Sequence, residues 1–187
     1  MTRYVAFLRA INVGGHVVKM DYLRQLFASM GFSNVETFIA SGNVIFESAA
    51  QEAHALERTI AARLQATLGY EVATFIRTAA ELAEIARYQP FPAADLQAAT
   101  LYIAFLAEPL DQEAQQKLMA FHSPVDEFHT YGREIYWLCR VRSSESEFSL
   151  AKLEKALGIR ATFRNASTVQ KIAARCALND TGPESAR

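Results

Sequence analysis

Tyr4-Val5-Ala6-Phe7-Leu8 is the stretch that decides the fold, because it recurs later in the chain as Tyr102-Ile103-Ala104-Phe105-Leu106. Both stretches are short, apolar and rich in aromatic or β-branched residues, which predicts two buried strands. Further landmarks follow in the same order: Leu68-Gly69 before Ala73-Thr74-Phe75 recurs as Leu157-Gly158 before Ala161-Thr162-Phe163. We therefore infer an internal duplication, with two similar halves in tandem.

The residues between these landmarks predict the same order of elements in each half. In the first half the pattern predicts strands near residues 4–9, 35–39, 43–47 and 72–76, with helices from about 20 to 30, 51 to 69 and 79 to 87. In the second half it predicts strands near residues 101–106, 127–131, 134–138 and 161–163, with helices from 111, from 150 and from 167. Gly31, Gly69 and Gly158 end three of the helices.

This order is β-α-β-β-α-β with an added helix, the ferredoxin-like arrangement, so we predict an α+β protein with two four-stranded antiparallel sheets. The expected domains are residues 1–92 and 93–178, followed by a flexible tail at 179–187. The strands are apolar on both sides, since Phe7 and Leu8 point to opposite faces. Helices cover one face, and we expect the other half of the chain, or a second copy of it, to cover the other.

Composition limits the classes of partner. The chain has 187 residues, 51% of them hydrophobic, and a formal net charge of -1, which is typical of a folded protein and argues against nucleic acid as a partner. No apolar run approaches the length of a membrane span, so we expect no membrane partner. Cys139 and Cys176 lack metal-binding spacing and suit a reducing, cytoplasmic location. We predict no cofactor and no metal, since the four histidines are scattered.

A glycine loop after the first strand is the main candidate for a binding site. Two adjacent glycines allow backbone N–H groups to turn inward between basic side chains, a combination that suits a small anionic ligand. The sheet topology places the turn between the second and third strands at the same edge. The candidate residues are Arg9, Asn12, Gly14, Gly15 and Lys19 of the loop, with Ser41, Gly42 and Asn43 of the turn. The alternative is purely structural: a tight glycine connection, a capping Asn12 and an ordinary hairpin turn.

Arg164 and Asn165 form a second candidate group, at the place that Arg77 and Thr78 occupy in the first half. An arginine beside a helix N-terminus can hold a carboxylate or a phosphate. The alternative is that Asn165 or Ser167 caps the last helix and that Arg164 pairs with an acid.

The long word Phe7-Leu8-Arg9-Ala10-Ile11-Asn12-Val13-Gly14-Gly15, then Lys19-Met20 and Ser41-Gly42-Asn43-Val44-Ile45-Phe46, resembles the bacterial domain-of-unknown-function 1697 family. Gln89-Pro90-Phe91 and the stretch Thr162 to Val169 resemble further segments of that family. The sequence departs from the family pattern at Ala10, where glycine is usual, and at Ala40, Phe163, Ala166 and Ser167. The resemblance implies a fold and supplies no activity.

Function therefore stays open between three classes. We predict a small binding module, with an enzyme of unknown class at the same cleft and a protein-interaction unit as alternatives. His16, inside the glycine loop, is the one histidine that could serve an enzyme, and a solvent-exposed loop residue is the alternative. Neither cysteine has a neighbouring histidine in the sequence, so no nucleophile is assigned. An RNA-binding platform is disfavoured, because the strand at 43–47 lacks the required basic and aromatic signature. The sequence does not determine the oligomeric state.

Overall fold

The computed structural model describes residues 1–12, 14–39, 42–50 and 52–180. The chain divides into two compact units, Met1–Ala86 with Gln170–Arg187 and Arg87–Val169. Each unit contains one four-stranded antiparallel sheet, so the predicted α+β fold with two ferredoxin-like halves is confirmed. The division into domains at residues 1–92 and 93–178 stays a prediction. Of the expected tail, Asn179 and Asp180 belong to the last helix, and residues 181–187 lie outside the described residues.

In the first unit the sheet has the strand order β2-β3-β1-β4. Its elements in chain order are β1 (Thr2–Leu8), α1 (Met20–Ser29), β2 (Ser33–Thr37), β3 (Asn43–Ser48), α2 (Ala53–Leu68), β4 (Thr74–Thr78) and α3 (Ala79–Arg87). Because β1 is central, it pairs with β3 on one side and with β4 on the other. This places the end of β1 beside the turn between β2 and β3.

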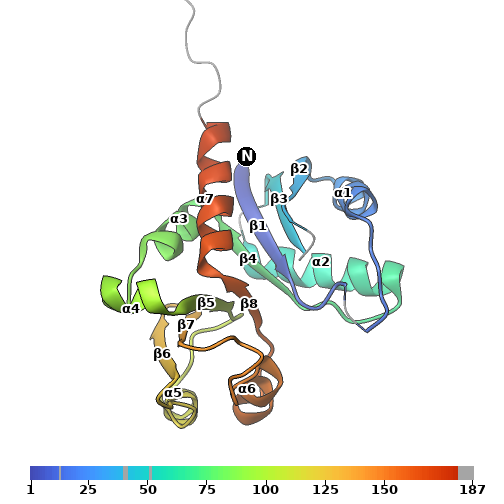
Figure 1. The fold of residues 1–187 in the computed structure, drawn as a ribbon. Helices are drawn as coiled ribbons and strands as arrows, with labels where there is room; N and C mark the ends of the chain where they lie inside the picture. Colours follow the sequence, from blue (N-terminus) through green and yellow to red (C-terminus); the bar gives the residue numbers. More distant parts are fainter. Residues whose placement is uncertain (13, 40–41, 51, 181–187) are drawn as a thin grey trace, which may run out of the picture. The chain divides into compact units, whose positions relative to one another are not determined.

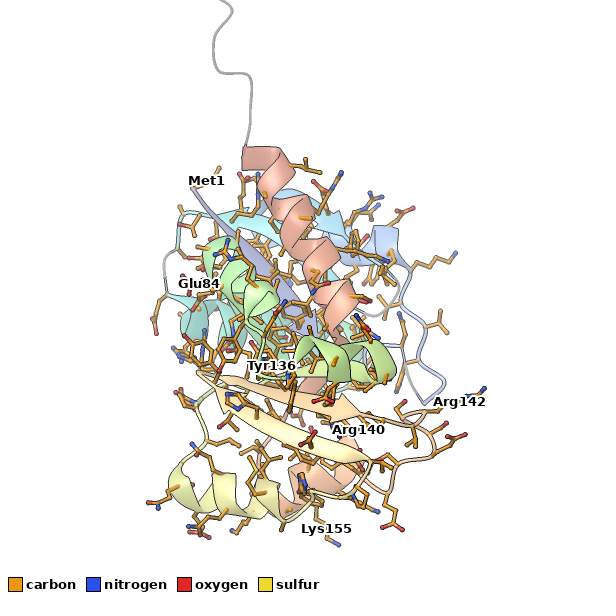
Figure 2. The ribbon with its side chains drawn as sticks, turned by 60° about the vertical axis from the view of Figure 1, so that its left-hand side comes forward. Met1, Glu84, Tyr136, Arg140, Arg142 and Lys155 are labelled. Atoms are coloured by element: carbon orange, nitrogen blue, oxygen red, sulfur yellow. The ribbon has the colours of Figure 1, made fainter. Side chains whose placement is uncertain are left out.

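The second unit repeats the order with β6-β7-β5-β8. Its elements are α4 (Ala93–Ala98), β5 (Thr100–Phe105), α5 (Gln112–Met119), β6 (Asp126–Tyr131), β7 (Glu134–Cys139), α6 (Leu150–Leu157) and β8 (Thr162–Asn165), followed by the start of α7 (Ala166–Asp180). The helix α4 is an addition that the sequence pattern did not predict. Arg140, labelled in Figure 2, bonds Glu127 of β6 and lies 4.0 Å from Asp95 of α4, which ties this short helix to the sheet.

Alternation along β1 divides its side chains between two faces. Tyr4, Ala6 and Leu8 pack into one hydrophobic core with residues of α1 and α2. In the second unit Ala104 and Leu106 occupy the corresponding core, beneath α5 and α6. Alternate side chains along each strand therefore determine which face of the sheet the paired helices cover.

The opposite face of the first sheet is contacted by the last helix of the chain. We expected helices on one face only, with the other half or a second copy over the remaining face. Later turns of α7, which group with the first unit, contact that face: Arg3 Nη1 donates to Cys176 O at 2.8 Å, and Arg175 Nε donates to Glu36 Oε2 at 2.9 Å. Figure 1 shows α3 and α7 on the side of β1 opposite α1 and α2. Residues 170–178 of α7 lie in the predicted second half, 93–178, so the contact is made by the other half of the chain as expected, although these residues group with the first compact unit.

Strand register corrects one detail of the repeat. The words Ala73-Thr74-Phe75 and Ala161-Thr162-Phe163 suggest that Phe75 matches Phe163. In the sheets, however, Phe7 pairs with Phe75 while the equivalent Phe105 pairs with Thr162. The structural alignment of the two last strands, β4 and β8, is thus shifted by one residue from the alignment that the sequence repeat suggests. The same registers place Arg77 opposite Val5 and Arg164 opposite Ile103, at equivalent positions.

Among the described residues, none of the helices combines the length and the apolar character that a membrane crossing requires.

We expect Ile172→Ala to lower the free energy of unfolding by about 2–5 kcal/mol, because Ile172 is fully buried on α7 and its removal leaves a cavity. Urea unfolding followed by circular dichroism measures this loss. The control is Lys171→Ala, an exposed neighbour on the same helix, which should change the value by less than about 0.5 kcal/mol. Equal stabilities for the two variants would contradict the role of α7 as part of the core.

Glu47 should contribute pH-dependent stability. Hydrogen bonds from Asn34 Nδ2 (2.8 Å) and Arg3 Nη2 (2.6 Å) hold the pKa of its carboxyl below the ordinary value. A lowered folded-state pKa gives stability that is complete above the unfolded-state pKa, about 4.5, and is lost as pH falls through the folded-state pKa. Urea titrations should therefore show a deficit for Glu47→Gln that is largest at neutral pH and shrinks in acid. Glu84→Gln, which alters an exposed carboxylate, should show no such trend.

Candidate functional site

The connection between β1 and α1 is longer than its counterpart in the second unit. It comprises residues 9–19, eleven in all, whereas six residues, 106–111, join β5 to α5. The shorter connection leads directly into its helix, where Asp111 Oδ1 accepts a hydrogen bond from Ala114 N at 2.8 Å as an N-cap. The scaffold therefore closes without the additional residues of the first loop.

Two side chains fix the base of the long loop. Asn12 Oδ1 accepts a hydrogen bond from Val18 N at 2.7 Å and joins the two ends of the loop. The Tyr70 hydroxyl, which follows α2, donates to Ile11 O at 2.9 Å, and its ring stacks on His16 with centroids 3.9 Å apart. Burial raises the pKa of Tyr70, so this phenol stays a hydrogen-bond donor at neutral pH. Asn12 thus has the backbone-capping role that the sequence offered as the structural alternative.

The tip of the loop consists of Gly14 and Gly15, both exposed, with φ of 65° and 84°. An added Cβ at either glycine would meet no atom within 4 Å, so it is the backbone conformation that favours glycine here. Arg9 and Lys19 are the first and last residues of the loop. Arg9 is partly buried and its backbone N–H donates to Ala73 O at 2.9 Å, while Lys19 is exposed at the N-terminus of α1.

The turn between β2 and β3 lies against the start of this loop, as the sheet order predicts. Leu8 N donates to Gly42 O at 2.8 Å, and a Cβ on Gly42 would come within 2.9 Å of Ile11 Cγ2. Asn43 is buried, and its Nδ2 donates to Phe38 O at 2.9 Å, so its side chain closes the turn. Ser41, predicted as a site residue, lies outside the described residues. Gly42 is therefore the turn residue that the structure places beside the loop.

Arg164 and Asn165 belong to the second unit. Arg164 Nη1 donates to Thr162 Oγ1 at 2.7 Å and to Phe163 O at 2.9 Å, and burial lowers the pKa of Arg164 to about 10. The guanidinium thus keeps its charge at neutral pH. Asn165 Oδ1 accepts from Ser167 N at 2.9 Å, which confirms the helix-capping alternative for Asn165. In the first unit Thr78 caps α3 from the equivalent register position, with Glu81 N donating to its hydroxyl at 3.1 Å.

Sequence reasoning did not place Tyr70 at the site. A signal for it exists in the repeat: the residue after the helix-ending glycine is Tyr70 in the first half and Ile159 in the second. Comparing the halves at this position would have drawn attention to a hydroxyl that only the loop-bearing half contains.

The histidines are distributed as the sequence indicates. His16 is exposed on the loop, His54 Nδ1 lies 3.1 Å from Glu57 Oε2, and His129 Nε2 lies 2.8 Å from the Tyr88 hydroxyl. Over the described ranges, no group of three or more His, Cys, Asp or Glu side chains is placed to hold a metal ion.

The protein is therefore an α+β protein with two ferredoxin-like units, and hydrogen bonds from Asn12 and Tyr70 hold the base of the glycine loop in the first unit. The family model described as "Protein of unknown function (DUF1697)" matches residues 1–136, and the chain belongs to that family. The solved structure of the conserved bacterial protein SP0830 from Streptococcus pneumoniae has the same fold, with a TM-score of 0.76 and 24% sequence identity over 95% of this chain and 99% of that one. No curated protein matches the chain.

Ala10, which departs from the family's usual glycine, has a φ of 56°. An L-residue with a side chain is strained there, so we expect Ala10→Gly to raise the free energy of unfolding by about 1 kcal/mol. Urea unfolding checks this gain. Ala28→Gly, on an exposed position of α1, serves as the control and should lower stability by about 1 kcal/mol. The same sign for both variants would contradict the strain at Ala10.

Proposed function

We propose that the protein is a binding module whose loop at residues 9–19 holds a small anionic ligand. The observation that carries this proposal is a loop longer than its counterpart, closed at its base by Asn12 and Tyr70, with two exposed glycines at its tip. A connection that is longer than the scaffold requires, with hydrogen bonds at its base, is a feature of binding loops.

The chemistry of the loop supports an anion. Arg9 and Lys19 provide positive charge on either side of the glycines, and neither glycine carries a side chain that would keep a ligand from the backbone. Gly42 brings the neighbouring turn against Ile11, so a ligand at the loop would also lie near the turn. Binding of this kind requires no acid–base pair.

A thermal-shift screen with inorganic phosphate, nucleotides, sugar phosphates and small carboxylates tests the proposal. A ligand at about a hundred times its dissociation constant stabilises the folded state by about 2.7 kcal/mol, which corresponds to a rise in Tm of about 5 °C or more for a chain of this size. The expected result is such a rise with at least one anion.

The site itself is tested with variants. Arg9→Ala and Lys19→Ala should each reduce the shift, because each removes one charge beside the glycines. Lys155→Ala, which removes an exposed charge on α6 in the second unit, should leave it intact. The proposal fails if no anion raises Tm, or if an anion does so equally in Arg9→Ala and Lys19→Ala.

A further inference from the structure

A hollow of about 510 Å³ opens in the second unit, between the end of α5, the start of β6 and the connection that leads into α6. Figure 1 shows α5 and α6 on the same side of the second sheet. The volume lies within the range of small-molecule pockets in proteins. Its lining includes two phenylalanine rings, the imidazole of His122 and four side chains of charged types: Phe121, Phe148, His122, Asp126, Glu145, Glu147 and Lys152.

The wall of this pocket comes from a connection that the repeat does not require. Ten residues, 140–149, join β7 to α6, whereas four residues, 49–52, join β3 to α2 in the first unit. The longer connection supplies Glu145, Glu147 and Phe148 to the lining. The pocket is thus lined in part by a connection that is longer than its counterpart in the first half.

Asp126 gives the pocket a buried negative group, with only 2% of its surface exposed. Its carboxylate accepts hydrogen bonds from Trp137 Nε1 at 2.8 Å, Ser146 Oγ at 2.9 Å and Ser123 Oγ at 3.1 Å. All three donors are neutral, and no cationic side chain of the described residues bonds this carboxylate. Buried charges in proteins are normally balanced by a charge of opposite sign.

The other charged groups add to the negative field. Glu145 and Glu147 are exposed in the connection, at the mouth of the pocket. Lys152 Nζ donates to the backbone oxygen of Glu147, which holds the one lysine of the lining on a carbonyl group. The lining therefore contains three carboxylates and one ammonium group, and that ammonium group is already bonded to a carbonyl oxygen. The local field of these groups attracts cations.

The aromatic rings define the apolar part. Phe121 and Phe148 meet edge to face with centroids 5.3 Å apart, and Phe148 is almost fully buried. Rings of this kind accommodate an apolar body and also attract a neighbouring cation through their faces.

We propose that this pocket binds a small organic cation, an ammonium or guanidinium group carried on an apolar body. The cationic group lies toward Asp126 and the acidic mouth, and the apolar body packs on Phe121 and Phe148. This site is separate from the anion-binding loop of the first unit, and its test does not depend on that proposal.

Trp137 provides the readout, because it is the only tryptophan and its indole N–H bonds Asp126 directly. Fluorescence titrations compare three probes of similar size: 2-phenylethylamine, 3-phenylpropionate and 2-phenylethanol. We expect a saturable change with the amine, with a dissociation constant on the order of 1 mM for a ligand this small. The acid and the alcohol should bind at least about tenfold more weakly, because they lack the positive charge. Calcium chloride, as a fourth probe, should give no saturable change.

Variants locate the binding. Asp126→Asn keeps the shape of the side chain and removes its charge, so affinity for the amine should fall at least about tenfold. If that variant does not fold, Glu145→Gln combined with Glu147→Gln tests the mouth and should weaken binding about threefold or more. Glu84→Gln in the first unit is the control and should leave binding unchanged. Equal binding of the three organic probes, saturation by calcium, no saturation by the amine, or unchanged affinity in the acid variants would overturn the proposal.

Discussion

The pairing of the central strand on both sides is the constraint on which the rest of this structure depends. β1 forms a ladder with β3 and another with β4, and β5 does the same with β7 and β8. Every inward side chain on these strands is fixed by that register, because a slip of one residue would move it to the opposite face. The same pairing fixes which connections meet at each end of the sheet, and so it also positions both candidate sites.

Each half adds one long connection to the shared scaffold, and the two additions differ in place and chemistry. The first half lengthens the connection after its first strand and carries glycines between basic residues. The second half lengthens the connection after its third strand and carries Glu145 and Glu147 beside a buried Asp126. The shared scaffold explains this freedom: once the sheet and two helices bury enough apolar surface, connections can differ at little cost in stability.

Polar groups in the two units organise loops and helix ends. Asn43 closes its turn, Asn165 and Thr78 cap helices from equivalent positions, and Asp126 gathers an indole and two hydroxyls. Local patterns offered the roles of Asn43 and Asn165 as alternatives, since Asn favours turns and helix starts. Nothing local predicted the bond between Trp137 and Asp126, because the two residues meet across β7 and β6.

The sequence alone determined the two halves, the order of the strands and of the helices other than α4, and the membership in a family, because period-two spacing, helical spacing and the repeated strand sequence are local signals. It also identified the glycine loop, in which Gly14 and Gly15 have positive φ values that glycine adopts without strain. Only the tertiary structure decided that later turns of α7 contact the first sheet, that the Tyr70 hydroxyl bonds Ile11 O, and that neutral donors bond Asp126 beside a pocket. These contacts join residues far apart in the chain, and their geometry follows from how the layers pack, which residue spacing does not encode.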